Sequence, residues 1–336
     1  MRRIARIAFL IFCIALFTVG ILEIVLRAWG YAEHHLYDPI YMPYEGCNDV
    51  NYILKPNLRG ARGNGNALVN TNELGLRYTA GSLLDSPKRD GEYRIALIGD
   101  SATFGAGIEK AEDTFAFIVE GILNSRSENL IFSVFNYAAC GYSVKEMAAI
   151  LRYRMLDCDP DLVLMAVIPQ DFALTRTPSV DDWGYLSDNR DFGMGLLNLR
   201  GAQFLRKSRL LHSLRYILYC LGHKYKLAEN CLGQGRYPES YKYIRQFRDI
   251  ASAQNISYAI VLLPDLNSSF YGLSQKLNQD NINFLDLEKV RGLFIRDQFM
   301  ASKFDPHISL LVHKKIGGLL SDYILDEFIK RQEQSE

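Results

Sequence analysis

From residue 94 to about residue 330, short apolar runs alternate with stretches of helical periodicity, and this alternation constrains the fold most. Five runs have the length of single strands: RIALIG, LIFSVFNYA, PDLVLMAVI, SYAIVLLPD and INFLDL. Continuous apolar runs this short are typical of strands buried on both faces of a sheet. Strands separated by helices predict an α/β fold with a parallel, doubly wound sheet.

The segments between these runs carry helix signals. DTFAFIVEGILNS has apolar residues at helical spacing. SVKEMAAILRYRM begins with Ser143 and has Glu146 three residues later, which is a capping box. Residues 172–200 show no clear period and are expected to loop over the sheet edge. Further helices are predicted over residues 201–226, which are amphipathic, 237–254 and 308–330.

The N-terminus differs from the rest of the chain. No charged residue occurs from Ile7 to Leu22, and apolar residues continue beyond Glu23. About 20 such residues suffice to cross ~30 Å of hydrocarbon as a helix. Glu23 and Arg27 are four residues apart, so they can pair on one helix face at the membrane interface. The segment is therefore predicted to be an uncleaved membrane anchor.

The charges that flank this segment predict its orientation. Three arginines precede it and only Arg27 follows closely, which predicts a cytoplasmic N-terminus and export of everything after about residue 30. Two alternatives remain. A signal peptide cleaved near the weak small-residue site at 28–30 is one, and a buried core helix is the other.

Charge and cysteine content exclude several classes of function. Lys+Arg and Asp+Glu both number 38, and no basic stripe is present, so nucleic-acid binding is not expected. Of the six cysteines, Cys13 lies in the apolar segment, and an odd number outside it argues against a complete disulfide framework. Cys220 and Cys231 could bridge locally, although most cysteines are expected to be buried small hydrophobes. No pair has metal-ligand spacing, so no metal is predicted.

The first strand, RIALIG, ends on Asp100 and Ser101. Ligands of such sheets bind beyond the carboxyl ends of the strands, which is where Ser101 is placed. A serine hydroxyl becomes a nucleophile only when a base takes its proton and donors stabilise the oxyanion. The sequence must therefore supply a histidine with an orienting acid, and further donors at neighbouring strand ends.

Among six histidines, only His307 has an acid beside it in a predicted loop before a helix. That acid is Asp305, and Pro306 restricts it to extended conformations. The alternative for His307 is a histidine at a helix N-terminus with no catalytic role. His313 lies inside the predicted helix and is expected to be a packing or surface residue.

Four motifs in order, GDSATFG, NYAACGYS, PDLVLMAVIPQD and DPHISLLVHKKI, resemble the four blocks of the SGNH/GDSL hydrolase superfamily. The resemblance covers about residues 93–330 and implies a three-layer α/β/α, flavodoxin-like sheet of about five strands. It implies that Ser101 is the nucleophile, with Asp305 and His307 completing the triad. The backbone N–H groups of Ser101 and Gly141 would be oxyanion donors.

The chain departs from the pattern of the superfamily at three places. The third block usually reads Gly-x-Asn-Asp, and here it reads Ile-Pro-Gln-Asp, so that Gln170 carries the donor amide on one more methylene. Gln170 is the expected third oxyanion donor. A single residue separates Asp305 from His307, where two are common, and Val312 replaces a usual glycine. Ser309 and His313 stand where Asn and His are common.

The anchor, a Lys-Pro-Asn segment at 55–57 and the stretch Asn72–Arg77 resemble a membrane-anchored subset of this superfamily. That subset is associated with modification of bacterial surface polysaccharides, by esterases or O-acyltransferases. Residues 55–77 are either a structural cap or supply Arg77 to the cleft. The expected domains are an anchor (1–30), an irregular cap (31–92) and an SGNH hydrolase-like catalytic domain (93–330).

The predicted protein is a single-pass, membrane-anchored serine esterase whose catalytic domain is periplasmic or extracellular. Its substrate would be an O-acyl ester, with O-acetyl on an exported carbohydrate favoured, and it would need no cofactor. One alternative is an O-acyltransferase, which would require a membrane partner that supplies the acyl group. The other is a non-catalytic glycan-binding or scaffold protein on the same fold, which the altered third block motivates.

Overall fold

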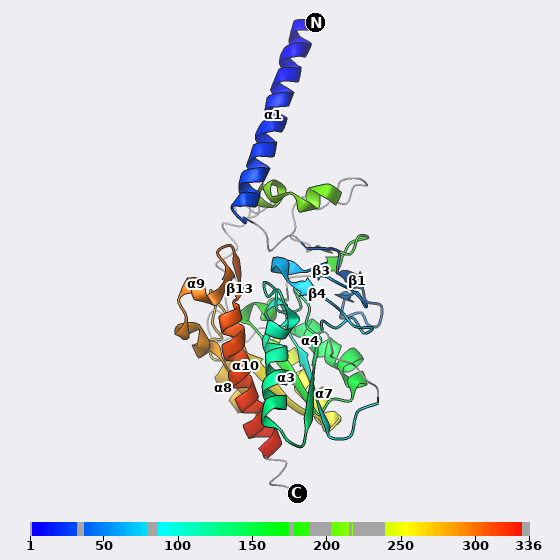
Figure 1. Cartoon of the computed structure of the whole chain (residues 1–336). Coiled ribbons are helices and arrows are strands. Elements are labelled where there is room, and N and C mark those ends of the chain that lie inside the picture. Colours follow the sequence, from blue (N-terminus) through cyan, green and yellow to red (C-terminus); the bar gives the residue numbers. More distant parts are fainter. Residues whose placement is uncertain are drawn as a thin grey trace.

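The computed structural model describes residues 2–31, 37–78, 87–174, 178–187, 203–214, 217 and 239–330. An isolated helix, α1, projects from a body built around one sheet (Figure 1). Three of the six histidines (34, 35 and 223) and the two cysteines that could bridge locally (220 and 231) lie outside the described residues. The four described cysteines, at positions 13, 47, 140 and 158, are free, and the last two are buried.

The central sheet has five strands in the order β11-β10-β7-β5-β6, and every pairing in it is parallel. This arrangement confirms the predicted fold class. All five strands fall on the predicted apolar runs. Their bounds are β5 Glu92–Ile98, β6 Ile131–Asn136, β7 Leu162–Val167, β10 Ser257–Leu262 and β11 Phe284–Asp286.

The sheet separates two apolar cores because alternate residues of each strand point to opposite faces. On β5, Leu97 belongs to one core and Ile98 to the other. Helices α3 (Phe115–Arg126) and α10 (Leu310–Ile324) cover the Leu97 face (Figure 1). Helices α4 (Val144–Ile150) and α7 (Tyr241–Ala253) cover the Ile98 face. Burial on both faces explains why the strands are continuously apolar.

Two predicted helix features are confirmed. Ser143 and Glu146 form the capping box at the start of α4, since Glu146 Oε2 accepts from Ser143 N at 2.9 Å and Ser143 Oγ accepts from Lys145 N at 3.2 Å. Helix α10 continues through its glycines because Gly317 lies against Ile118 of α3. A Cβ at Gly317 would come within 2.5 Å of Ile118 Cγ2, so glycine lets the two helices approach closely.

Two other segments differ in part from the prediction. Within residues 172–200, the described part includes a short hairpin of β8 (Ser179–Val180) and β9 (Leu186–Ser187) rather than loop alone. Strands of two residues show no alternation in the sequence. Within the predicted helix 201–226, the structure describes a 3₁₀ turn, η7 (Gln203–Lys207), and helical residues 209–214 and 217.

Residues 37–78 form turns and short strands, as predicted. Their bounds are β1 Tyr41–Pro43, β2 Tyr52–Leu54, β3 Ala61–Arg62, the turn η2 Asn64–Asn66, and β4 Leu68–Val69. Tyr41 and Tyr52 are fully buried in the same core as Ile98. This segment therefore packs on the body of the molecule instead of linking it loosely to the anchor.

The remaining short elements lie between these strands and helices or, for the last of them, after the closing helix. They are α2 Ser101–Phe104, η3 Ala111–Asp113, η4 Leu151–Met155, η5 Leu156–Cys158, η6 Pro169–Phe172, α8 Leu273–Gln279, η8 Glu288–Leu293, α9 Arg296–Phe299, β12 Met300–Ser302, β13 Asp305–Ile308 and η9 Leu325–Ile329.

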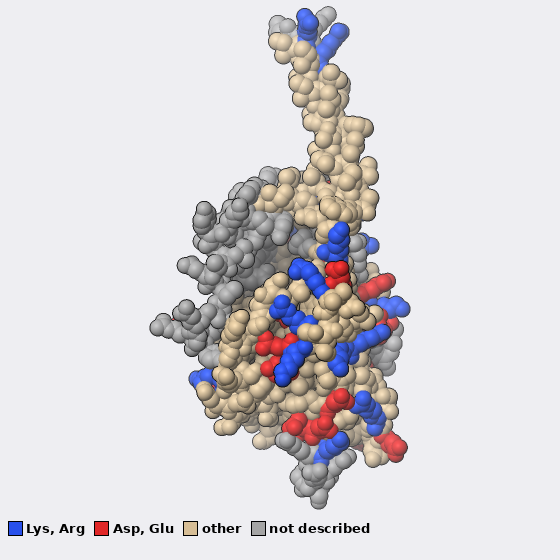
Figure 2. Space-filling model, turned by 90° about the vertical axis from the view of Figure 1, so that its left-hand side faces the viewer, with Lys and Arg blue, Asp and Glu red and all other residues tan. Residues whose placement is uncertain are grey.

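Helix α1 (Arg2–Ala28) is long and apolar enough to cross a membrane. Within the span Arg3–Ala28, the apolar window has a mean hydropathy of 2.8 and contains no buried residue. Figure 2 shows it as a tan column with basic side chains at its tip. The predicted pair forms near its other end, where Arg27 Nε lies 2.8 Å from Glu23 Oε1.

Candidate active site

Strand register brings three of the predicted motifs to one edge of the sheet. On strand β5, which lies between β6 and β7, Leu97 is opposite Asn136 of β6, and Ile98 is opposite Met165 of β7. Each strand ends within a few residues of these pairs, so the loops that follow emerge side by side. These loops carry Ser101, Gly141 and Gln170.

Ser101 is the first residue of the short helix α2. Asp100 is the N-cap, and its Oδ1 accepts from Ala102 N at 2.9 Å, which satisfies one free N–H of the helix start. The Ser101 hydroxyl donates to Asp100 Oδ2 at 3.2 Å. Gly99 must be glycine, because a Cβ there would lie 2.7 Å from the carbonyl oxygen of Ala166.

The acid and the base lie on one strand. Asp305 and His307 belong to β13, which pairs antiparallel with β12, so His307 is in a hairpin and not in the predicted loop. Pro306 holds the backbone extended, and an extended segment beside a partner strand forms a ladder. Asp305 Oδ1 lies 2.5 Å from His307 Nδ1 and also accepts from His307 N at 3.1 Å. This contact orients the imidazole.

The hairpin lies against α2, the helix that begins with Ser101. The structure therefore places the Asp305–His307 pair beside the helix that begins with Ser101, at the carboxyl end of β5. Because Asp305 occupies Nδ1 of His307, Nε2 is the nitrogen left to receive a proton from a nucleophile.

Two carboxylates act on the charge of His307. Burial alone would lower the pKa of His307, but the hydrogen bond and charge of Asp305, together with the charge of Asp100, raise it above its usual value. Burial in turn raises the pKa of Asp100, against the opposing effects of the Ala102 N–H and the charge of His307. The site is thus arranged to stabilise an imidazolium.

Two glycines from distant parts of the chain pack on the Asp305 carboxylate. Gly65, in η2, has φ +67°, and a Cβ there would collide with Asp305 Oδ2. Gly107 has φ +81°, and its Cβ would lie 3.0 Å from the same oxygen. Gly107 N donates to the carbonyl of Asn64 at 3.1 Å, which joins the two turns. Both the left-handed backbone and the close approach require glycine.

Gly141 follows β6 in a left-handed conformation, with φ +88°. The peptide unit that contains its N–H also contains the carbonyl of Cys140. The buried Tyr52 hydroxyl donates to that carbonyl at 2.7 Å, and the Tyr142 hydroxyl donates to the Tyr52 carbonyl, also at 2.7 Å. Tyr52, on strand β2, therefore fixes the plane of the peptide whose N–H is the expected oxyanion donor.

Gln170 lies in η6, directly after β7, and its side chain is exposed. The neighbouring Asp171 is buried, and its Oδ2 accepts from Ile168 N at 2.8 Å, which fixes the turn. Among the described residues, no hydrogen bond engages the Gln170 amide, and its role as an oxyanion donor stays a prediction.

Arg77 does not line the cleft. It is 1% exposed, and its guanidinium donates to the carbonyls of Phe104, Gly105, Leu68 and Ile108 at 2.8 to 3.1 Å. Two of these carbonyls close the C-terminal end of α2. Burial lowers the pKa of Arg77 to about 10. The structure thus favours the structural-cap alternative for residues 55–77.

His313 is buried, as the packing interpretation predicts. Its Nδ1 accepts from Phe115 N at 3.0 Å, and its ring stacks on Phe115. Burial, with the charges of Arg77 and His307, lowers the pKa of His313 to about 3, so the ring is neutral. It joins α10 to α3 behind the hairpin.

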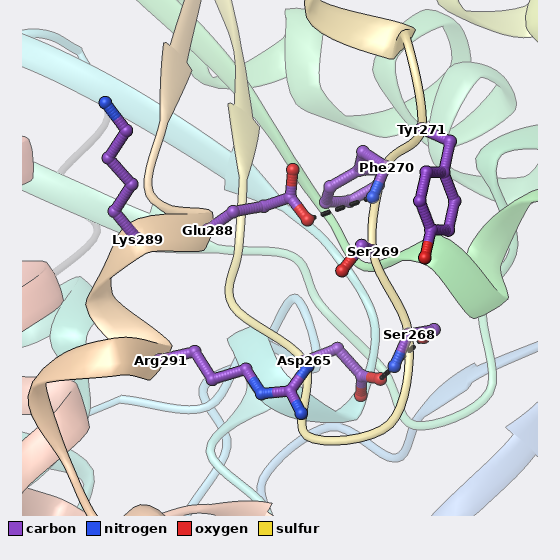
Figure 3. A pocket seen from close by; sticks show the side chains of 8 residues that line it. All are labelled: Asp265, Ser268, Ser269, Phe270, Tyr271, Glu288, Lys289 and Arg291. Atoms are coloured by element: carbon purple, nitrogen blue, oxygen red, sulfur yellow. Dashed lines mark hydrogen bonds between the residues drawn. The ribbon is translucent and has the colours of Figure 1, made fainter.

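A polar cavity of about 320 Å³ opens at the ends of β10 and β11 and contains none of the triad (Figure 3). Asp265 Oδ2 accepts from Ser268, and Glu288 Oε1 accepts from Phe270 N at 2.9 Å, so the acids shape the loop itself. Within the described ranges, no three His, Cys, Asp or Glu residues are grouped to hold a metal ion.

Sequence reasoning missed Tyr52, Gly65 and Gly107. Tyr52 and Gly65 lie in the irregular segment before β5, where no periodic pattern shows which side chains face the sheet. The one feature of the sequence that pointed to these glycines was the glycine-rich, turn-like composition around positions 65 and 107.

No protein-family model and no curated protein matches the chain. Solved structures similar to it include three esterase-class proteins. One is a protein from Desulfitobacterium hafniense assigned to the G-D-S-L family of lipolytic proteins, with 14% identity, TM-score 0.41, and 68% of this chain and 98% of that chain covered. The second is a two-domain esterase active on acetylated mannans, with 15% identity, TM-score 0.44, and coverages of 71% and 50%. The third is a Clostridium thermocellum family 3 carbohydrate esterase, with 14% identity, TM-score 0.40, and coverages of 70% and 96%.

At this level of similarity, no activity or substrate is carried over to this chain. The function must be argued from its own residues. Three of the four motifs follow strands at one edge of the parallel sheet, and the fourth lies on the β12–β13 hairpin against α2.

Proposed function

We propose that the protein is a serine esterase of SGNH type that hydrolyses O-acyl esters, with O-acetyl groups on an exported carbohydrate as the favoured substrate. One observation carries the proposal: the Asp305–His307 pair, 2.5 Å apart, lies on a hairpin against the helix that begins with Ser101. A binding module has no need of a nucleophile, a base and an orienting acid at one strand end.

In the proposed reaction, the Ser101 hydroxyl attacks the acyl carbonyl while His307 Nε2 takes its proton. Asp305 stabilises the imidazolium that forms. The N–H groups of Ser101 and Gly141 and the Gln170 amide are the proposed donors to the oxyanion. His307 then returns the proton to the leaving alkoxide, and water attacks the acyl-enzyme with His307 again as base.

The Ser101 hydroxyl must turn before it can react. In the structure it donates to Asp100 Oδ2 at 3.2 Å, so its O–H must turn from that carboxylate toward His307 Nε2 before attack. Catalytic hydrogen bonds are often formed fully only when substrate is bound. In this proposal, the bond to Asp100 is the resting position of the hydroxyl.

The membrane anchor and export are part of the proposal. Helix α1 is long and apolar enough to span a bilayer, and the arginines before it favour a cytoplasmic N-terminus. The catalytic residues would then act outside the cytoplasmic membrane. Alkaline phosphatase fused after residue 330 should be active if this is correct, and inactive if the domain stays in the cytoplasm.

An active-serine phosphonate probe tests the nucleophile. The detergent-solubilised full chain should gain one adduct by intact mass, located by peptide mapping at Ser101. Ser101→Ala and His307→Ala should both abolish labelling. Ser125→Ala removes an exposed serine of α3 and should leave labelling unchanged. A folded protein that never labels, or that labels equally without His307, would refute the triad and favour the scaffold alternative.

A further inference from the structure

The residues at the C-terminal end of α1 and just after it, 27–31, which we call the foot of α1, pack on the turn of the β12–β13 hairpin. Trp29 and Tyr31 make edge-on contacts with the ring of Phe304, with centroids 5.4 and 5.3 Å apart. Lys303 Nζ lies 5.6 Å from the centroid of Trp29. Phe304 immediately precedes Asp305 in the chain, so the aromatic contact at the membrane helix adjoins the acid of the dyad.

A second contact joins α1 to the helical residues 209–214. The carboxylate of Glu23 accepts from Arg209 N and Leu210 N at 3.0 Å and from the Ser208 hydroxyl at 2.9 Å. These are the free N–H groups of a helix start, and Glu23 caps them from the side of α1. Arg27 adds a bond to the carbonyl of Lys207 at 2.9 Å.

Helical residues 209–214 lie crosswise to α1, at the level of its last turns (Figure 1). Leu214 and Ile217 are 48% and 51% exposed there. A short helix that exposes apolar side chains beside the end of a membrane span is placed to lie in the interface. The basic side chains of Lys207 and Lys303 are also exposed near the foot of α1 and suit anionic headgroups.

From these contacts we infer that the catalytic site is held at the bilayer surface and acts on an ester carried by an amphiphile whose apolar part stays in the membrane. The occupant of the surface formed by Leu214, Ile217 and the foot of α1 is the lipid headgroup region. The inference rests on the esterase activity proposed above. It adds that the contacts between the end of α1 and the catalytic domain, and not only the covalent link to the anchor, give the site access to its substrate.

The test compares one ester in two physical states. The full chain is placed in nanodiscs of phosphatidylethanolamine with phosphatidylglycerol. One substrate is an O-acetylated methyl glucoside in solution, and the other is the same O-acetylated sugar on a hexadecyl chain in the bilayer. The uncoupled variant carries Glu23→Ala, Arg27→Ala, Trp29→Ala and Tyr31→Ala, which remove both contacts with α1, and about 20 Gly/Ser residues inserted after Tyr31. Such a spacer has an r.m.s. length of about 25 Å, which frees the site from the surface while keeping the anchor.

We expect the uncoupled variant to keep the wild-type kcat/KM for the soluble ester within about two-fold and to lose at least ten-fold for the membrane-borne ester. Equal retention of both activities, or equal loss of both, overturns the inference. If wild type and Ser101→Ala are equally inactive on both esters, the proposed function itself has failed.

A second readout does not depend on activity. A benzophenone amino acid replaces Leu214 in one variant and Ile131 in another. Ile131 is the matched control, since it is also 48% exposed but begins β6 at the opposite end of the sheet. Photolysis in the nanodisc should attach lipid at position 214 and not at position 131. Equal attachment at both, or none at 214, overturns the docked arrangement.

Discussion

The peptide between Cys140 and Gly141 offers a sharp test of how the oxyanion hole is built. Its carbonyl accepts from the Tyr52 hydroxyl at 2.7 Å, and its N–H is the expected oxyanion donor. Because a peptide unit is planar, a bond that fixes the carbonyl also fixes the direction of the N–H. Tyr52→Phe removes this bond and keeps the ring in its buried place.

The size of the effect can be bounded. Complete loss of one oxyanion donor costs about 2.7–4 kcal/mol in the transition state. In Tyr52→Phe the donor remains but is free to tilt, so we expect a smaller cost of about 1.4 kcal/mol, a ten-fold fall in kcat. KM should stay within about two-fold, because the oxyanion forms only after binding. The lost bond should also lower the free energy of unfolding by about 1–3 kcal/mol, since the Cys140 carbonyl is left buried.

Tyr142→Phe is the matched control. Its hydroxyl donates at the same distance, 2.7 Å, but to the Tyr52 carbonyl and not to the oxyanion peptide. We expect a similar loss of stability with kcat largely retained. Steady-state kinetics on a small ester, with binding of a boronate transition-state analogue, separate the two variants. If both tyrosines lower kcat alike, or if Tyr52→Phe lowers only stability, the positioning argument is wrong.

Three further predictions follow from the site. In the proposed mechanism neutral His307 is the base, and its pKa is raised above 6.5, so kcat/KM should fall with acid at a midpoint above pH 6.5. Asp100→Asn removes one charge that raises this pKa while keeping an N-cap oxygen, so its pH profile should show the midpoint at lower pH. Gly107→Ala puts a Cβ 2.6 Å from the Cβ of Ala301 and 3.0 Å from Asp305 Oδ2. Because Asp305 would have to move, esterase activity should fall at least ten-fold. Retention of activity would contradict the packing argument. The folded-state pKa of His313 is about 3, so its contribution to stability is present above pH 6.5 and is lost as pH falls, by at most about 1.4 kcal/mol per unit. The variant His313→Asn keeps an acceptor for Phe115 N, so its free energy of unfolding, measured with denaturant, should lack the loss of stability in acid that His313 causes. If the wild type and the variant lose stability equally as pH falls, His313 is not the titrating group.

The five strands of the sheet were predictable from the sequence because burial on both faces leaves a continuous apolar signal. Strand β7, LVLMAV, is fully buried and shows this pattern plainly. The capping box at Ser143 was equally predictable, because it depends on two residues only three positions apart in the sequence. Ser101, Asp305 and His307 could be named as candidates from the sequence because chemistry restricts the residue types that such a site can use.

The hairpin of β12 and β13 was not predicted, because strands of three and four residues do not establish an alternation. The roles of Tyr52 and Gly65 in positioning the site also could not be predicted from the sequence. Their roles depend on contacts with Cys140 and Asp305, which lie far away in sequence. Arg77 was noticed, but only its burial decides between the cleft and the structural cap.

The interlocking of residues 37–78 with the site bears on how the protein can be divided or recombined. A chain begun at residue 93 would keep all four motifs, yet it would lose Tyr52 behind the oxyanion peptide, Gly65 beside the acid and Arg77 at the end of the nucleophile helix. The first 92 residues are therefore not an exchangeable module. Grafting the α/β body alone onto another anchor should give a protein with the right motifs and a disordered site.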